Sequence, residues 1–256
     1  MTERLTVRDI DLDVLRCGAG RPLLLLHGFD PVPSHAPFLE RLGAHAEVVA
    51  PSHPGFGRSS RPDAIDSVYD LVRVYLDVLD RWPAERVAVL GLSFGGWLAA
   101  ELASISSSRI ERLVLVDAVG IKVSPPDTPD IYDVFNRSPH DVHRRRWHDP
   151  DRWKPDFDAM TDEELIAHHR NRESLCRYAW HPYMHNPKLR QWLGRIDVPT
   201  LVLWGASDGI VSPDYGRAYS AAIPGSRFEL IEGAGHHPEL EQPELFVDRV
   251  VAFLKE

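Results

Sequence analysis

The sequence predicts an α/β fold, with a mostly parallel central sheet that is flanked by helices. Short apolar runs recur along the chain, as expected for strands that are covered on both faces of a sheet. Helical patterns separate these runs, and such alternation is typical of parallel sheets with helices on both sides. The expected strands are residues 21–29, 47–51, 86–93, 112–118, 199–205 and 226–233.

The other elements of this core have their own signals in the sequence. Residues 5–9 and 12–17 mix charged residues with strand-forming ones, so we expect an antiparallel pair ahead of the parallel strands. A helix is predicted from about residue 68, with Asp66 or Ser67 as its N-cap. Its apolar face, at helical spacing, is formed by Val68, Leu71, Val72, Tyr75 and Leu79. Two further helices are predicted at 95–103 and 243–254.

Residues 121–195 interrupt this alternation, because they contain no strand-like run. Four of the seven tryptophans lie there, and Thr161 with Glu164 forms the capping-box pattern that starts a helix. We therefore expect a helical cap at 121–195. It would be inserted into a core domain made of residues 1–120 and 196–256.

The composition of the 256 residues favours a globular protein that acts on a small molecule. The net charge of −9 disfavours nucleic acid and anionic membranes as partners, because both require a basic surface. The basic run 144–146 is interpreted as a solvated face. Cys17 and Cys176 are the two cysteines, which fits a reducing compartment and neither a disulfide framework nor a zinc site. With no signal-peptide core and no long apolar run, we expect a cytoplasmic monomer or homodimer.

The segment 87–100 contains the pattern G-x-S-x-G, formed by Gly91, Ser93 and Gly95. An expected strand precedes it and an expected helix follows it, which is the setting of a nucleophile elbow. Such a sharp turn puts the serine in an unfavourable backbone conformation, so the residues two positions away must be small. It also leaves the N–H of Phe94 at a helix N-terminus, where an anion is favoured. Ser93 is therefore the predicted nucleophile.

A serine hydroxyl requires a base, and the base requires an orienting carboxylate. Asp208 follows the expected strand 199–205, and His236 lies in the loop after the next strand. All three residues then lie at carboxyl ends of strands, where α/β sheets place their sites. Asp117 also ends an expected strand and is kept as an alternative acid, with local capping of the backbone as its other interpretation.

Five motifs in order resemble the α/β-hydrolase superfamily, in its single-domain serine hydrolase form with a helical cap. They are HGF at 27–29, PGFGRS at 54–59, GLSFGG at 91–96, WGASDGIV at 204–211 and GAGHHPELEQPELF at 233–246. The order Ser, Asp, His is also the order of this fold. The resemblance implies that His236, which directly follows the second glycine of its loop, is the base. It further implies an oxyanion hole formed by the backbone N–H groups of Phe29 and Phe94.

Three functions are compatible with these residues. The first is hydrolysis of a small, largely apolar carboxylic ester through an acyl-enzyme on Ser93. The second is carbon–carbon bond hydrolysis, which a resemblance to meta-cleavage product hydrolases implies, with Arg177 or Arg190 binding a substrate carboxylate. The third is a receptor that binds a small molecule on a hydrolase fold. We expect no cofactor and no metal site, and we expect His237, Trp180 and Arg190 to contact the substrate.

Overall fold

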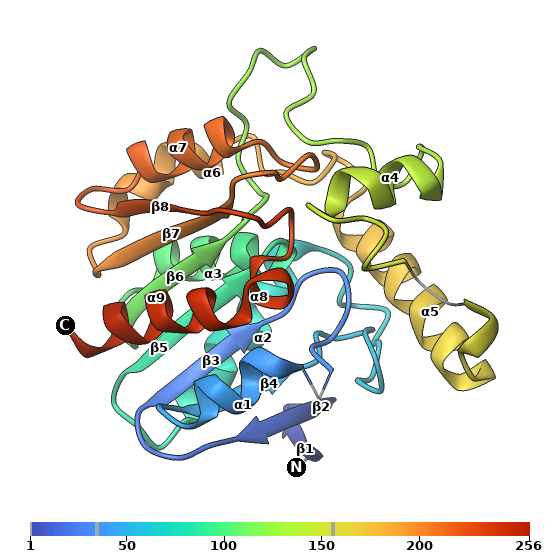
Figure 1. The fold of residues 1–256 in the computed structure, drawn as a ribbon. Coiled ribbons are helices and arrows are strands. Elements are labelled where there is room, and N and C mark those ends of the chain that lie inside the picture. The colour runs from blue at the N-terminus through green and yellow to red at the C-terminus, as the bar shows by residue number, and fades with distance from the viewer. Residues whose placement is uncertain (1, 34–35, 155–156) are drawn as a thin grey trace.

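In the part of the chain that the structure describes, eight strands form one central sheet (Figure 1). The computed structural model describes residues 2–33, 36–154 and 157–256. The strands are β1 (Thr2–Val7), β2 (Ile10–Cys17), β3 (Pro22–Leu26), β4 (Glu47–Pro51), β5 (Val87–Leu92), β6 (Ile110–Val116), β7 (Thr200–Gly205) and β8 (Arg227–Ile231). Their order is β1-β2-β4-β3-β5-β6-β7-β8, and only the pairs β1–β2 and β2–β4 are antiparallel among these strands. The predicted α/β class with a mostly parallel sheet is confirmed.

Helices cover both faces of the sheet (Figure 1). They are α1 (Pro37–Gly43), α2 (Val68–Arg81), α3 (Phe94–Ile105), α7 (Pro213–Ala221), the short α8 (Pro238–Glu241) and α9 (Pro243–Lys255). Helices α1 and α9 share one apolar cluster with Leu23 and Leu25 of β3, while α2, α3 and α7 share the other with Leu24 and Leu26. Because β3 is apolar on both faces, it appears in the sequence as an unbroken apolar run.

Between β6 and β7 the described residues form helices and loops, with no strand of the sheet among them. We call residues 121–195 the inserted segment. Its helix α5 begins with the predicted capping box, because the side chains of Thr161 and Glu164 accept hydrogen bonds from each other's backbone N–H. Figure 1 shows α4 and α5 apart from the helices that flank the sheet. The helices of this segment are α4 (Pro139–Arg146), η1 (Phe157–Ala159), α5 (Asp162–Ala179), α6 (Leu189–Trp192) and η2 (Leu193–Arg195).

Ser67, rather than Asp66, is the N-cap of α2, since its side chain accepts a hydrogen bond from the N–H of Asp70. Across the described ranges, each helix is either too short or too polar to cross a membrane.

We call residues 232–237, which carry His236, the histidine loop. Gly205 ends β7 at the point where this strand meets the histidine loop. A Cβ atom added to Gly205 would lie 1.8 Å from the carbonyl oxygen of Gly235. The contact is between two backbones, so a change of rotamer cannot relieve it. By contrast, the same added atom on Gly194 has nothing within 4 Å. Position 205 therefore requires glycine, because a side chain there would keep the end of β7 from packing against the histidine loop.

We predict that Gly205→Ala lowers the free energy of unfolding by about 1–3 kcal/mol, because the histidine loop must move to admit the methyl group. Gly194→Ala is the matched control and should change stability by less than about 1 kcal/mol. Urea unfolding followed by circular dichroism measures both values. Equal stability of the two variants would contradict the packing described at β7.

Candidate active site

Ser93 lies in the turn between β5 and α3, in a strained backbone conformation. Its φ is 49° and its ψ is −109°, outside the regions that residues with side chains favour. A Cβ atom on Gly91 would lie 2.4 Å from the Gly95 carbonyl oxygen, and one on Gly95 would lie 2.1 Å from the Leu26 carbonyl oxygen. The turn therefore closes only because both neighbours lack a side chain.

Ser93, His236 and Asp208 form one hydrogen-bonded chain. Ser93 Oγ lies 2.8 Å from His236 Nε2, and His236 Nδ1 lies 2.7 Å from Asp208 Oδ2. Asp208 Oδ1 accepts hydrogen bonds from the N–H groups of Ile210 and Val211, at 2.8 and 3.0 Å, which fix the carboxylate. An imidazole that donates from Nδ1 presents a lone pair at Nε2 to the serine hydroxyl. The arrangement has the geometry of a nucleophile, a base and an orienting acid.

The two N–H groups that were predicted to form an oxyanion hole belong to neighbouring loops. Phe94 begins α3, and Phe29 lies in the loop after β3. A Cβ atom on Gly28 would lie 3.2 Å from Ser93 Cβ, so this loop contacts the serine turn. Within the described ranges, neither N–H donates to another group of the protein. Both therefore remain available to a bound anion, and their role stays a prediction.

Two buried histidines hold the loop that carries Phe29. The N–H of His53 donates to His27 Nε2 at 2.9 Å, and His53 Nε2 donates to the His27 carbonyl oxygen at 2.9 Å. The rings stack with centroids 3.7 Å apart, and the hydroxyl of Tyr75 bonds His53 Nδ1. Burial lowers the pKa of His53 to about 3. Burial, and then the neighbouring His53, lower the pKa of His27 well below its usual value. Both imidazoles are therefore neutral near pH 7.

A small cavity of about 30 Å³ lies beside Ser93. Its wall is mostly apolar, and both the core and the inserted segment contribute to it. The polar groups among its lining are Ser93, Arg146, His236 and His237. The full lining is Phe29, Ser93, Phe94, Val119, Ile131, Val134, Arg146, Leu175, Met184, Ile210, His236 and His237.

Comparison with known proteins agrees with this geometry. Residues 23–249 match the model of a family described as the alpha/beta hydrolase family, which is most of the chain. The chain belongs to this family. A 2-hydroxy-6-oxo-2,4-heptadienoate hydrolase from Pseudomonas putida is 29% identical over 262 residues, which cover 96% of this chain and 93% of the relative. Lipase 1 from Psychrobacter immobilis is 26% identical over 246 residues, which cover 92% of this chain and 77% of the lipase.

Solved structures of other α/β hydrolases have the same fold. A meta-cleavage product hydrolase from Pseudomonas fluorescens superimposes with a TM-score of 0.79 at 22% identity, over 99% of this chain and 97% of its own. A thermophilic esterase from Thermogutta terrifontis superimposes with a TM-score of 0.77 at 23% identity, over 100% of this chain and 98% of its own. At these identities the likeness concerns the fold alone.

In this α/β hydrolase, His237 lies in the wall of the cavity beside Ser93. Its ring centroid lies 4.7 Å from that of Trp147, and its Nδ1 lies 3.0 Å from Glu239 Oε1. Burial, and then the neighbouring His236, lower the pKa of His237 well below its usual value. Burial also raises the pKa of Glu239 to about 7. His237 is therefore a neutral, packed side chain next to His236.

The structure places Trp180 and Arg190 outside this wall, in contrast to the substrate contacts expected of them. Trp180 follows the C-terminal end of α5, is 57% exposed and packs against Phe135 with ring centroids 5.6 Å apart. Arg190 is exposed on α6, and its guanidinium lies 3.5 Å from a backbone carbonyl oxygen. Arg177 donates to the carbonyl oxygen of Asp63 at 2.6 Å. The arginines were suggested by the resemblance to meta-cleavage product hydrolases and Trp180 by the aromatic content of the segment, and neither signal says which helix face turns toward the core.

Arg146 is the wall residue that the sequence did not reveal. The interpretation of the run 144–146 as a solvated face is wrong for this residue, because its guanidinium lies 5.6 Å from the ring centroid of Phe29. Its Nε is buried without a hydrogen-bond partner, and no carboxylate of the described chain pairs with it. Burial lowers the pKa of Arg146 from its usual value, but an arginine remains charged in proteins. An unpaired cation therefore lies in the cavity wall.

The inserted segment is hydrogen-bonded directly to the histidine loop. The N–H of His236 donates to the carbonyl oxygen of Arg146 at 2.6 Å. The buried carboxylate of Glu241 accepts from the N–H of Gly235 at 2.6 Å and from the N–H of His148 at 2.8 Å. The end of α4 thus helps to fix the backbone of the histidine that bonds Ser93.

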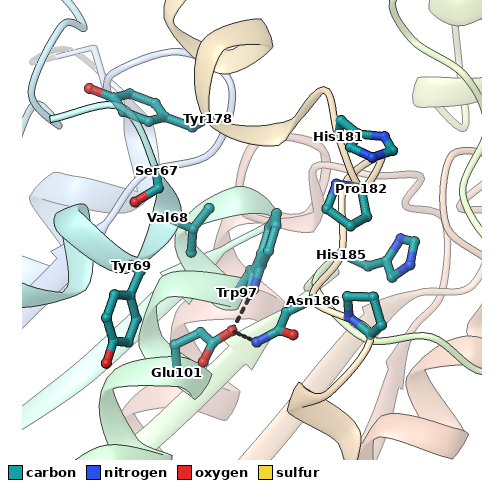
Figure 2. Close-up of a pocket in the computed structure, with 11 residues that line it drawn as sticks. Ser67, Val68, Tyr69, Trp97, Glu101, Tyr178, His181, Pro182, His185 and Asn186 are labelled. Carbon is teal, nitrogen blue, oxygen red and sulfur yellow. Dashed lines mark hydrogen bonds between the residues drawn. The ribbon is translucent and has the colours of Figure 1, made fainter. Parts of the chain in front are cut away.

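A larger cavity of about 210 Å³ lies at another junction between the core and the inserted segment (Figure 2). Figure 2 shows Glu101 between Trp97 and Asn186, whose side chains donate to its Oε1 at 3.1 and 2.8 Å. This cavity shares no lining residue with the cavity beside Ser93. It is therefore separate from the candidate active site.

Asp117, Asp208 and His236 are close enough to share a metal ion, since one ligand atom of each lies within 4.8 Å of the others. The hydrogen bond from His236 Nδ1 to Asp208 Oδ2 already joins two of these groups. That hydrogen bond accounts for the closeness of Asp208 and His236.

We predict that the protein loses stability in acid because His27 and His53 are buried as neutral bases. In the unfolded chain both bind protons below about pH 6.5, whereas the folded protein resists protonation of His53 until about pH 3. The free energy of unfolding should fall from about pH 6.5 downward, by up to about 1.4 kcal/mol per pH unit for each histidine. Urea unfolding at several pH values should show a smaller slope for His53→Gln. An unchanged slope would show that His53 is not buried as a neutral base.

Proposed function

We propose that this protein is a serine hydrolase that works through an acyl-enzyme on Ser93. The observation that carries the proposal is the hydrogen-bonded chain from Ser93 Oγ through His236 to Asp208, with distances of 2.8 and 2.7 Å. Membership of the alpha/beta hydrolase family supports it. The unpaired N–H groups of Phe29 and Phe94 in the two adjoining loops support it further.

In the proposed reaction, Ser93 Oγ attacks the carbonyl carbon of the substrate while its proton passes to His236 Nε2. The carbonyl oxygen becomes an oxyanion and accepts hydrogen bonds from the N–H groups of Phe29 and Phe94. His236 then gives the proton to the leaving group, and the bond between that group and the carbonyl carbon breaks. Water attacks the acyl-enzyme by the same route, which releases a carboxylic acid and restores Ser93. Asp208 orients the imidazole and stabilises its charged form in both halves.

The first candidate substrate is a small, largely apolar carboxylic ester. The cavity beside Ser93 is small, and its wall suits a short acyl chain, because burial of apolar groups is the main source of affinity in such sites. The apolar part of this wall is formed by Val119, Ile131, Val134, Leu175 and Met184, with the two phenylalanines. A lipase and an esterase are among the similar proteins.

The second candidate reaction is carbon–carbon bond hydrolysis. It is supported about as well as ester hydrolysis, and Arg146 is the residue that favours it. An unpaired guanidinium in an apolar wall suits a substrate that carries a carboxylate, which arginine binds through two parallel hydrogen bonds. The relative from Pseudomonas putida is named as a hydrolase of a dienoate, a compound class with such a carboxylate. In this proposal Arg146 takes the role that the sequence suggested for Arg177 or Arg190. His236 would then deliver its proton to a carbon leaving group.

We predict that Ser93→Ala lowers kcat by about 10⁴-fold or more on p-nitrophenyl acetate and on a ring-fission dienoate, since the acyl-enzyme cannot form. The wild-type protein should also be labelled by a fluorophosphonate probe, and the variant should not. Unchanged circular dichroism is the control for folding. Full activity of Ser93→Ala would overturn the proposal, and labelling of the wild type without turnover of either substrate would favour a small-molecule receptor.

We predict that Arg146→Met lowers kcat/KM for a dienoate by about 10–100-fold, the effect of losing a hydrogen-bonded charge partner. Turnover of p-nitrophenyl acetate should change by less than about threefold, because that ester has no anionic group. Arg144→Met, a neighbouring exposed arginine, is the matched control and should leave both reactions unchanged. Equal losses on both substrates would contradict an anion-binding role for Arg146.

A further inference from the structure

Asp117 lies directly after β6 and beside the proposed acid of the triad. Its side chain is buried, with 1% of the residue exposed, and Asp208 is 5% exposed. One carboxylate oxygen of each residue and one ring nitrogen of His236 lie within 4.8 Å of one another. Asp117 also has a φ of 44°, a strained value that surrounding contacts must maintain. Two buried carboxyl groups therefore share one small volume next to the base.

The hydrogen bonds around the two carboxyl groups are unequal. Asp208 receives three donors: the N–H groups of Ile210 and Val211 and the Nδ1–H of His236. Asp117 Oδ1 receives one, from the N–H of Gly205 at 2.9 Å, and its Oδ2 is buried with no donor from the described chain. Because donors stabilise the ionised form of a carboxyl group, Asp208 is the better place for a negative charge.

The surroundings of Asp117 also favour its neutral form. Burial raises its pKa well above the usual range, and the nearby charges of Asp208 and Glu239 raise it further. The backbone N–H of Gly205 is the group that opposes this rise. No lysine or arginine of the described residues forms an ion pair with Asp117. Two adjacent buried carboxylates without a cation between them cannot both remain ionised.

We propose that Asp117 is a neutral carboxylic acid whose Oδ2–H donates a hydrogen bond to the carboxylate of Asp208, and that this bond positions the triad acid. The inference rests on the proposed function, in which Asp208 orients His236. Asp117 Oδ1 accepts from the end of β7 while the acid proton on Oδ2 satisfies the otherwise unpaired atom. Asp117 thereby connects the end of β6, the end of β7 and the acid of the triad.

This role differs from that of a displaced triad acid. A displaced acid would have to accept the hydrogen bond from His236 Nδ1, but Asp208 Oδ2 already accepts it at 2.7 Å. Asp117 acts through Asp208 and is a positioning residue. Its proton keeps a single negative charge in the pair, so the imidazole faces one carboxylate rather than two.

The test uses Asp117→Asn and Asp117→Leu, assayed for kcat, KM and the acid limb of the kcat/KM profile against pH. Asparagine keeps an acceptor for the N–H of Gly205 and supplies an N–H donor in place of the acid proton. We expect Asp117→Asn to retain kcat/KM within about threefold with the acid limb at the same pH. Leucine supplies neither group, so Asp117→Leu should lower kcat by about 10–100-fold with KM nearly unchanged. Asp130→Asn is the matched control, because this aspartate also caps backbone N–H groups but does not line the cavity beside Ser93.

Two results would overturn the inference. If Asp117 were ionised, Asp117→Asn would remove a negative charge beside the base, and the acid limb would move to lower pH by about one to three units. If Asp117 did not position Asp208, Asp117→Leu would keep the wild-type kcat while folding normally. Should the leucine variant fail to fold, the pH profile of Asp117→Asn decides alone.

A wrong proposed function would give results that differ from those of a wrong inference about Asp117. In that case the wild-type protein would show neither fluorophosphonate labelling nor turnover that depends on Ser93. Loss of activity in Asp117→Asn as complete as in Asp208→Asn, in an otherwise active enzyme, would instead make Asp117 an acid of the triad and overturn its positioning role only.

Discussion

The strained backbone at Ser93 is the constraint on which the rest of the site depends. A positive φ at a residue with a side chain is unfavourable, and here it is maintained by glycines that let β3, the serine turn and α3 approach within backbone contact. This approach places the hydroxyl of Ser93 at the carboxyl ends of the parallel strands, where β6, β7 and β8 also end. Asp117, Asp208 and His236 follow those strand ends, so one turn brings together groups from four separate parts of the chain.

The inserted segment contributes residues and hydrogen bonds to the candidate site. The carbonyl oxygen of Arg146 holds the N–H of His236, while its guanidinium lies in the cavity wall. Glu241 joins the same region to Gly235 through buried hydrogen bonds. Changes in this segment that alter the shape of the cavity will therefore also act on the position of the imidazole.

The polar groups near Ser93 are mostly neutral, and this follows from burial. His27, His53 and His237 have depressed pKa values and Asp117 a raised one, all with burial as the first cause. Arg146 in the cavity wall keeps its charge, because a guanidinium stays protonated in proteins. In a small cavity with a mostly apolar wall, each hydrogen bond to a developing charge acts with little screening.

The sequence by itself determined the layered fold and the candidate triad. Apolar runs without alternation require cover on both faces of a sheet, and the glycines around Ser93 require a turn that a side chain would block; both are local properties. It did not determine that Arg146, rather than Trp180 or Arg190, would face the cavity. It also did not determine that Asp117 would lie against Asp208. Those placements depend on how helices of the inserted segment and strand ends distant in sequence pack together, so only the tertiary structure decided them.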